Sequence, residues 1–88
     1  MNVEFRASFA RDLKKIKDEK LTARVRQVID RVERAQSLQE VENLKKLRGG
    51  DRYYRIRIGD YRIGLAVEEN TVTFVRFLHR RDVYRYFP

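Results

Sequence analysis

The chain of 88 residues is short, strongly basic and free of cysteine. A chain of this length buries only about 60 to 65% of its unfolded surface, so we expect one domain, residues 1–88, with a small core. Without cysteine there can be no disulfide and no thiolate zinc site, and the single histidine cannot build a metal cage with ordinary ligand spacing. The composition therefore predicts a domain with no metal and no cofactor.

The formal charge of +8 favours a polyanionic partner such as nucleic acid, an acidic protein or an anionic membrane surface. The positive excess is concentrated over residues 45–62, where seven Lys/Arg accompany two Asp/Glu. The N-terminal sequence MNVEFRASFAR lacks the apolar run of a signal peptide, and no uncharged stretch reaches the roughly 18 residues of a membrane span. We expect a soluble cytoplasmic protein.

The first half of the chain predicts a strand followed by two helices. The alternating residues NVEF form the candidate strand, and Phe9, Leu13 and Ile16 then recur at helical spacing from an expected N-cap at Ser8. After the polar break KDEK, a second apolar stripe follows at Leu21, Val25, Val28, Ile29, Val32 and Ala35. This pattern predicts a helical hairpin with one buried stripe on each helix.

The second half predicts three strands, at 52–58, 61–68 and 71–78, after a connector with one helical turn near Leu38–Val41. The tail RRDVYRYFP has room for a short helical turn. The order β-α-α-β-β-β predicts an α+β fold: two N-terminal helices pack on one face of a mainly antiparallel four-stranded sheet. The other face of the sheet should be free.

The residues Gly59 and Asp60 predict a two-residue type II′ turn, which fixes the register of the hairpin. Arg57 then faces Arg62, and Arg55 faces Gly64. The helix-facing side of the hairpin is apolar and consists of Tyr54, Ile56, Ile58, Tyr61, Ile63 and Leu65.

The opposite side of the hairpin gathers Arg55, Arg57 and Arg62 beside the small residues Gly64 and Ala66. Like charges directly across a strand pair are destabilising, and a merely solvated face more often alternates in sign. We therefore interpret this side as a functional basic surface. The small residues predict a shallow depression that a phosphate backbone could approach.

The facing of the third strand depends on the turn EEN. If the turn preserves parity, Val75, Phe77 and His79 join the arginines; a bulge would reverse the assignment. Under the same assumption, the helix-facing side receives Val72, Phe74, Arg76 and Leu78. Arg80, Arg81 and Tyr84 follow near the basic side of the sheet.

Three segments, NLKKLRGG, YRIRIGDYRIGLAV and FLHRRDVYR, resemble the RelE branch of the RelE/ParE toxin superfamily, and the resemblance covers nearly the whole chain. It implies a RelE-like toxin of a type II toxin-antitoxin pair that cuts messenger RNA in the ribosomal A site. The implied reaction is a metal-independent attack of a ribose 2′-hydroxyl on its own 3′ phosphate. The implied partners are a cognate antitoxin, the ribosome and messenger RNA, without a membrane or a small-molecule cofactor.

Position by position, the resemblance implies that the catalytic residues are Arg55, Arg57, Arg62, Arg80 and Tyr84, with Arg81 as an alternative to Arg80. Arginine keeps its proton and can stabilise charge, so we expect Tyr84 to take the 2′ proton and Arg80 or His79 to assist the leaving oxygen. Orientation without a dedicated base would also suffice. The expected RNA-binding residues are Lys45, Lys46, Arg48, Arg52, His79 and Arg81.

Two other functions are compatible with the fold that the resemblance implies. A ParE-like toxin would inhibit DNA gyrase by binding protein, but such relatives typically lack the full set of basic residues and the tail tyrosine. A basic module could instead bind RNA without cutting it. Assays of translation and of gyrase would distinguish the two toxin classes.

Overall fold

The computed structural model describes residues 1–88 and contains a five-stranded sheet covered by two helices. In chain order the elements are β1 (Asn2–Phe5), α1 (Ala7–Lys14), α2 (Glu19–Arg34), η1 (Leu38–Glu40), β2 (Leu44–Lys46), β3 (Tyr53–Ile58), β4 (Tyr61–Glu68), β5 (Thr71–His79) and α3 (Val83–Tyr86). The strand order is β1-β5-β4-β3-β2, and only the β1–β5 pair is parallel. The α+β class is confirmed. None of the helices is long and apolar enough to cross a membrane.

The fifth strand, β2, lies in the segment that the sequence predicts as a connector. It has three residues and pairs antiparallel with β3, Lys45 lying opposite Arg55. Its two lysines are exposed, so it carries no alternating apolar pattern by which a strand is recognised. The helical turn predicted near Leu38 is confirmed as η1.

The two N-terminal helices begin in different ways. The carboxylate of Asp18 accepts the N–H groups of Lys20 and Leu21 and caps α2. The expected N-cap of α1 at Ser8 is wrong, because Ser8 lies inside the helix and its hydroxyl donates to the Val75 carbonyl at 2.6 Å. β1 runs directly into α1 and fixes the start of the helix without a side-chain cap.

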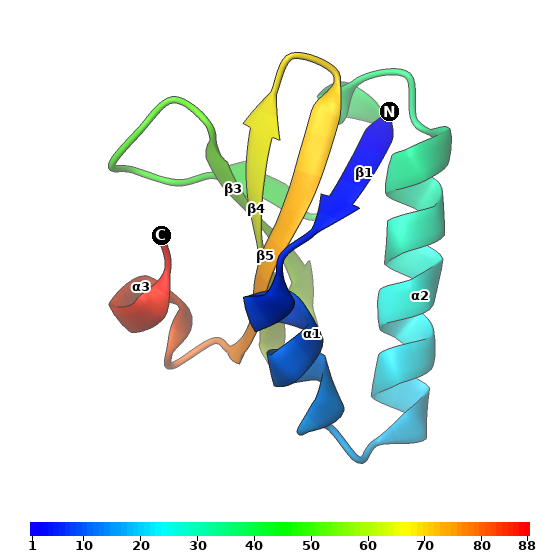
Figure 1. Ribbon diagram of the computed structural model, residues 1–88, viewed down its shortest axis with the longest axis vertical. Coiled ribbons are helices and arrows are strands. Elements are labelled where there is room, and N and C mark those ends of the chain that lie inside the picture. Colours follow the sequence, from blue (N-terminus) through cyan, green and yellow to red (C-terminus); the bar gives the residue numbers. More distant parts are fainter.

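The main core lies between the sheet and the first two helices (Figure 1). Phe9 of α1 and Val25 and Val32 of α2 are buried against the strands. The strand side of this core consists of Ile56, Ile58, Ile63, Leu65, Val72, Phe74 and Phe77. The apolar side predicted for the β3–β4 hairpin is confirmed.

The opposite side of the sheet is not free, because the chain end folds back onto it. α3 lies on the side of the sheet away from α2 (Figure 1). Leu47, Val83 and Phe87 form a second, smaller core there, with Tyr53, Val75 and Leu78 packed around it. The sequence contains these apolar residues but shows no pattern that assigns them to the second face.

A bulge in β5 reverses the facing of its second half. The pairing passes from Gly64–Arg76 to Leu65–Phe74 and leaves Val75 without a partner. The parity-preserving prediction is therefore wrong for all four residues after the bulge. Phe77 lies in the main core, and Arg76 lies opposite Gly64, on the side of the arginines. Leu78 packs beside the smaller core, and His79 lies opposite Tyr61.

Asp12 of α1 holds the chain just after this bulge. Its carboxylate accepts the Arg76 Nε–H at 2.7 Å and the backbone N–H of Phe77 at 2.9 Å. The hydrogen bond from the Arg76 guanidinium to Asp12 raises the pKa of Arg76, with burial acting in the opposite direction. Arg76 therefore does not point freely into the main core, as the simple alternation would require.

Candidate functional site

The arginines of the β3–β4 hairpin share the face predicted for them. Gly59 has a φ of 56° at the first position of the turn, and the register places Arg57 directly opposite Arg62 and Arg55 opposite Gly64. Because side chains alternate along a strand, these arginines point away from the buried isoleucines that face the main core. The hairpin thus presents three guanidinium groups on the side of the sheet that α3 occupies.

Arg62 is the centre of the charge cluster. Burial lowers the pKa of Arg62, and the neighbouring charges of Arg55, Arg57 and Arg80 lower it further, whereas Tyr84 acts in the opposite direction. The register places Arg57 directly opposite Arg62 and Arg55 opposite Gly64 on the same face, and the backbone N–H of Arg80 donates to the Asp60 carbonyl in the hairpin turn at 2.7 Å. With Tyr84, these residues form the group that surrounds Arg62. They come from β3, β4, the end of β5 and α3.

The guanidinium groups of Arg55 and Arg62 are held by backbone carbonyls, and no arginine of the cluster pairs with a carboxylate. Arg62 Nη1 donates to the carbonyls of Gly59 and Tyr61, both at 2.9 Å, and Arg55 Nη1 donates to the Asn43 carbonyl at 2.9 Å. None of the salt bridges of the structure involves an arginine of this cluster. Their positive charge therefore remains available to an anion, which planar guanidinium groups can bind bidentately.

Tyr84 projects from α3 beside a second group of basic residues. Its side chain is 68% exposed. A hollow of about 420 Å³ next to it is lined by Lys45, Lys46, Leu47, Arg48, Tyr84, Phe87 and Pro88. Three of the predicted RNA-binding residues thus gather around the tail tyrosine, although the sequence shows only that they precede the hairpin.

The other predicted RNA-binding residues lie elsewhere. Arg52 forms an ion pair with Glu68, and its hydrogen bonds to Tyr53 and then Glu68 raise its pKa. The ring of His79 packs against Tyr61 at 5.4 Å, and its Nδ1 accepts the N–H of Arg81, which is exposed in the following turn. Arg52 and His79 are thus engaged by other groups of the protein, and their contact with RNA stays a prediction.

The depression predicted beside Gly64 is filled by the chain's own tail. A Cβ atom at Gly64 would lie 2.8 Å from the ring of Phe87, and both residues are buried. The prediction of an open floor is therefore wrong. Sequence reasoning missed Phe87, for which the only signal was an aromatic residue near the chain end and a small residue in a central strand.

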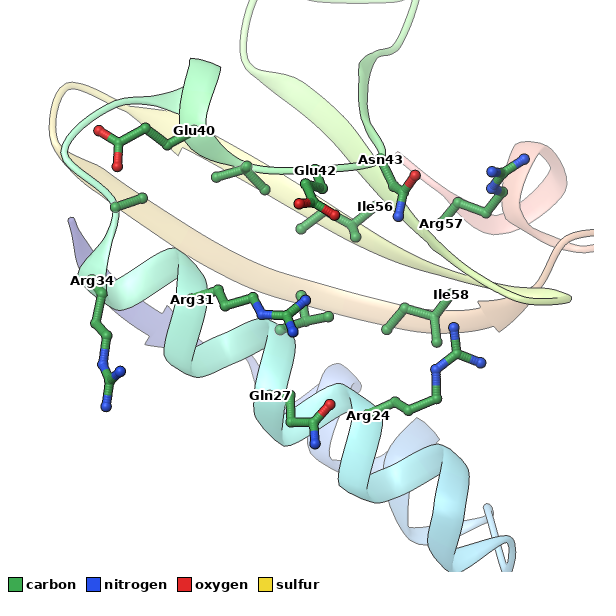
Figure 2. Close-up of a pocket in the computed structure, with 13 residues that line it drawn as sticks. Arg24, Gln27, Arg31, Arg34, Glu40, Glu42, Asn43, Ile56, Arg57 and Ile58 are labelled. Carbon is green, nitrogen blue, oxygen red and sulfur yellow. The ribbon is translucent and has the colours of Figure 1, made fainter.

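A groove of about 300 Å³ lies between α2 and β3, with the segment 40–43 that precedes β2 along one side. Figure 2 shows Arg24 and Arg31 reaching from α2 toward the strands, whereas Arg57 points away from α2. The apolar lining consists of Val28, Ala35, Val41, Ile56 and Ile58, and the polar rim consists of Arg24, Gln27, Arg31, Arg34, Glu40, Glu42, Asn43 and Arg57. Sequence reasoning missed this groove, because its walls come from segments that are apart in the chain.

Comparison with known proteins places this chain in a toxin family. A family model described as the ParE toxin of the type II toxin-antitoxin system, parDE, matches residues 3–84. Toxin RelE3 of Methanocaldococcus jannaschii is 39% identical over 89 residues, covering all of both chains. The chain belongs to the RelE/ParE superfamily of type II toxin-antitoxin toxins and is RelE-like.

Solved structures of toxin-antitoxin complexes contain chains of the same fold. The RelB-RelE antitoxin-toxin complex from Methanococcus jannaschii has a chain with a TM-score of 0.80 and 37% identity, covering 97% of this chain and 99% of that one. The toxin-antitoxin complex RelBE2 from Mycobacterium tuberculosis has a chain with a TM-score of 0.69 and 27% identity, covering 90% and 96%. The predicted resemblance to the RelE branch is confirmed.

Proposed function

We propose that this toxin is a cytoplasmic endoribonuclease that cuts messenger RNA in the ribosomal A site. The observation that carries the proposal is the placement of Arg55, Arg57 and Arg62 on one face of the β3–β4 hairpin without a carboxylate partner. Arg80 joins them at the hairpin turn, where its N–H donates to the Asp60 carbonyl, and Tyr84 follows in α3. Like charges repel one another in the free protein, so an anion bound among them would relieve a cost that the fold carries. A phosphodiester of RNA has the required charge and geometry.

The proposed reaction is the in-line attack of a ribose 2′-hydroxyl on the adjacent phosphorus. A bond forms between the 2′ oxygen and phosphorus, and the bond between phosphorus and the 5′ oxygen breaks. The products are a 2′,3′-cyclic phosphate and a free 5′-hydroxyl, so one proton leaves the 2′ oxygen and one reaches the 5′ oxygen. Negative charge gathers on the non-bridging oxygens in the transition state, where guanidinium groups stabilise it most strongly in a site that excludes water.

Two residues are proposed to act on the attacking 2′ oxygen and on the leaving 5′ oxygen. Tyr84 acts as the phenolate and accepts the proton of the 2′-hydroxyl, and Arg80 stabilises the negative charge on the leaving 5′ oxygen. Water protonates the 5′ oxygen, and the hydroxide that remains takes the proton from Tyr84 and restores the phenolate. Arg80 is preferred to His79 because its backbone N–H is bonded to the Asp60 carbonyl in the hairpin turn next to Arg62, whereas the His79 ring packs on Tyr61. The side chain of Tyr84 is exposed and can reach a bound RNA strand.

The partner of the free toxin is proposed to be an acidic antitoxin segment that docks in the groove between α2 and β3. This is supported by the RelB-RelE complexes among similar structures and by the lining of the groove. The apolar floor suits one face of an amphipathic segment. The four arginines at the rim outnumber the two glutamates and favour an acidic sequence.

Cleavage of messenger RNA on programmed ribosomes tests the proposed activity. The wild-type protein and Arg62→Ala should be compared, with Arg26→Ala as a control, since Arg26 is an exposed arginine of α2 outside the groove. We expect mapped 5′ ends inside the A-site codon for the wild type and the control, and little cleavage with Arg62→Ala. Intact message with the wild-type protein, or full cleavage with Arg62→Ala, would refute the proposal.

Inhibition of DNA gyrase is the second candidate, favoured by the ParE description of the matching family model. This activity requires a protein-binding surface and does not require Tyr84 beside a cluster of arginines. A supercoiling assay with purified gyrase distinguishes the two candidates. Loss of supercoiling at toxin concentrations that leave messenger RNA intact would favour gyrase.

A further inference from the structure

The ring of Phe87, near the chain end, packs directly on Gly64 of β4. The Phe87 side chain is 4% exposed. A Cβ atom built on Gly64 would lie 2.8 Å from two atoms of the Phe87 ring, closer than real Cβ contacts. Because Gly64 has no side chain, the Phe87 ring can lie directly on the backbone of β4 at this position. We call this contact surface at Gly64 the seat of the ring.

The segment that carries Tyr84 is held by two buried side chains, those of Val83 and Phe87. α3 has four residues, which is too short for a helix to be stable by itself. It is attached through Val83 and Phe87, which pack with Leu47, and Phe87 also meets Tyr53 edge to face at 5.7 Å. The Phe87 N–H donates to the Val83 carbonyl at 2.8 Å, so the position of the ring fixes the turn on which Tyr84 stands.

We propose that Phe87, seated on Gly64, is a positioning residue that places the Tyr84 hydroxyl at the arginine cluster. This inference rests on the proposed cleavage reaction. Gly64 lies directly opposite Arg55 in the β3–β4 pair, so the seat lies inside the basic face. The contact of the Phe87 ring with Gly64 thus sets the distance between Tyr84, which takes the proton, and the arginines that bind the phosphate.

A side chain at position 64 should displace the tail that carries Tyr84 and leave the sheet in place. The main core has ten buried residues, whereas the smaller core has three. When Gly64→Ala brings a methyl group against the ring, the tail moves and the sheet does not, because the tail is held by far less buried surface. A displacement of about 1 Å at a reacting group can slow a reaction by up to about 10²-fold.

The first experiment measures single-turnover cleavage on programmed ribosomes with Gly64→Ala and Phe87→Ala. We expect a rate constant about 10- to 10²-fold lower, with little change in the concentration needed for half-saturation, since the arginines are untouched. In a Tyr84→Phe background the same substitutions should have little further effect. Wild-type rates with Gly64→Ala, or an equal loss in both backgrounds, would overturn the inference.

The second experiment restores the contact with a smaller side chain. The double variant Gly64→Ala/Phe87→Leu should cleave faster than Gly64→Ala alone, because leucine leaves room for the added methyl group. Limited trypsin digestion at Arg85 reports the docking of the tail without any cleavage assay: Gly64→Ala and Phe87→Ala should be cut faster than the wild type.

Phe5→Ala is the matched control for trypsin digestion, because Phe5 is an aromatic residue on β1 whose ring packs against Phe9 and Phe74. It should leave the digestion of the tail unchanged. A double variant no faster than Gly64→Ala, or a tail equally resistant in all variants, would overturn the inference. A wild-type protein that leaves the message intact would refute the proposed function, while the digestion would still decide whether the seat holds the tail.

Discussion

Arg57 and Arg62 lie directly across from each other in the β3–β4 hairpin, with no carboxylate bridged to either. The lowered pKa of Arg62, caused by burial and by its arginine neighbours, means that the folded state disfavours the charged form relative to the unfolded chain. That cost is present wherever arginine is protonated in the unfolded chain, which includes neutral pH. It would be relieved only at a pH high enough to deprotonate arginine.

Replacing Arg62 by glutamine should therefore stabilise the fold while it weakens cleavage. Removal of one of two opposed like charges should contribute about 0.5 kcal/mol, and the melting temperature should rise by roughly 2 to 4 °C. The gain should shrink as salt is added, because salt screens the repulsion. Calorimetry against Arg26→Gln provides the measurement, and a lower melting temperature for Arg62→Gln than for this control would contradict the cost assigned to the cluster.

Tyr84→Phe should reduce cleavage and leave stability unchanged. The side chain is 68% exposed, and its hydroxyl makes no hydrogen bond within the protein, so removal of the hydroxyl leaves no buried group unpaired. General base catalysis contributes about 10²- to 10⁴-fold, and we expect a loss of that size in the single-turnover rate constant. Urea unfolding should give the wild-type midpoint. Full cleavage by the variant would show that orientation alone supplies the rate.

Asp12→Ala should strongly destabilise the protein, because it leaves Arg76 and the Phe77 N–H without their partner. The loss of one member of a buried ion pair costs about 3 kcal/mol. Asp30→Ala is the matched control, since Asp30 pairs with Arg34 on the surface of α2 at 3.4 Å and should cost less than about 0.5 kcal/mol. Equal urea midpoints for the two variants would contradict the clamping role of Asp12.

Arg31→Glu should weaken binding of the antitoxin, because Arg31 lies at the rim of the groove and a glutamate there would repel an acidic segment. Arg26→Glu makes the same change of charge on α2 outside the groove. Titration calorimetry with the cognate antitoxin should show at least a tenfold weaker affinity for Arg31→Glu than for Arg26→Glu. Similar affinities would place the antitoxin elsewhere on the toxin.

Much of the fold could be predicted because it depends on local sequence patterns. The Gly59-Asp60 turn fixed the pairing of β3 with β4 residue by residue, and the apolar spacing of α2 placed its buried face. The facing of β5 after Val75 could not be predicted, because a bulge is set by partners outside the strand. Here the partner is Asp12, which is far from it in the sequence.

The sequence by itself determined which residues could form a basic surface and which side of the hairpin would carry it, since alternation and turn chemistry act over a few residues. Only the tertiary structure decided how the tail closes the site. Gly64, Leu47 and Phe87 come from three separate segments, and their contact depends on packing between them. The groove beside α2 is likewise formed by the packing of α2 against β3, which are separate segments of the chain. No local sequence pattern predicts which segments will pack together in this way.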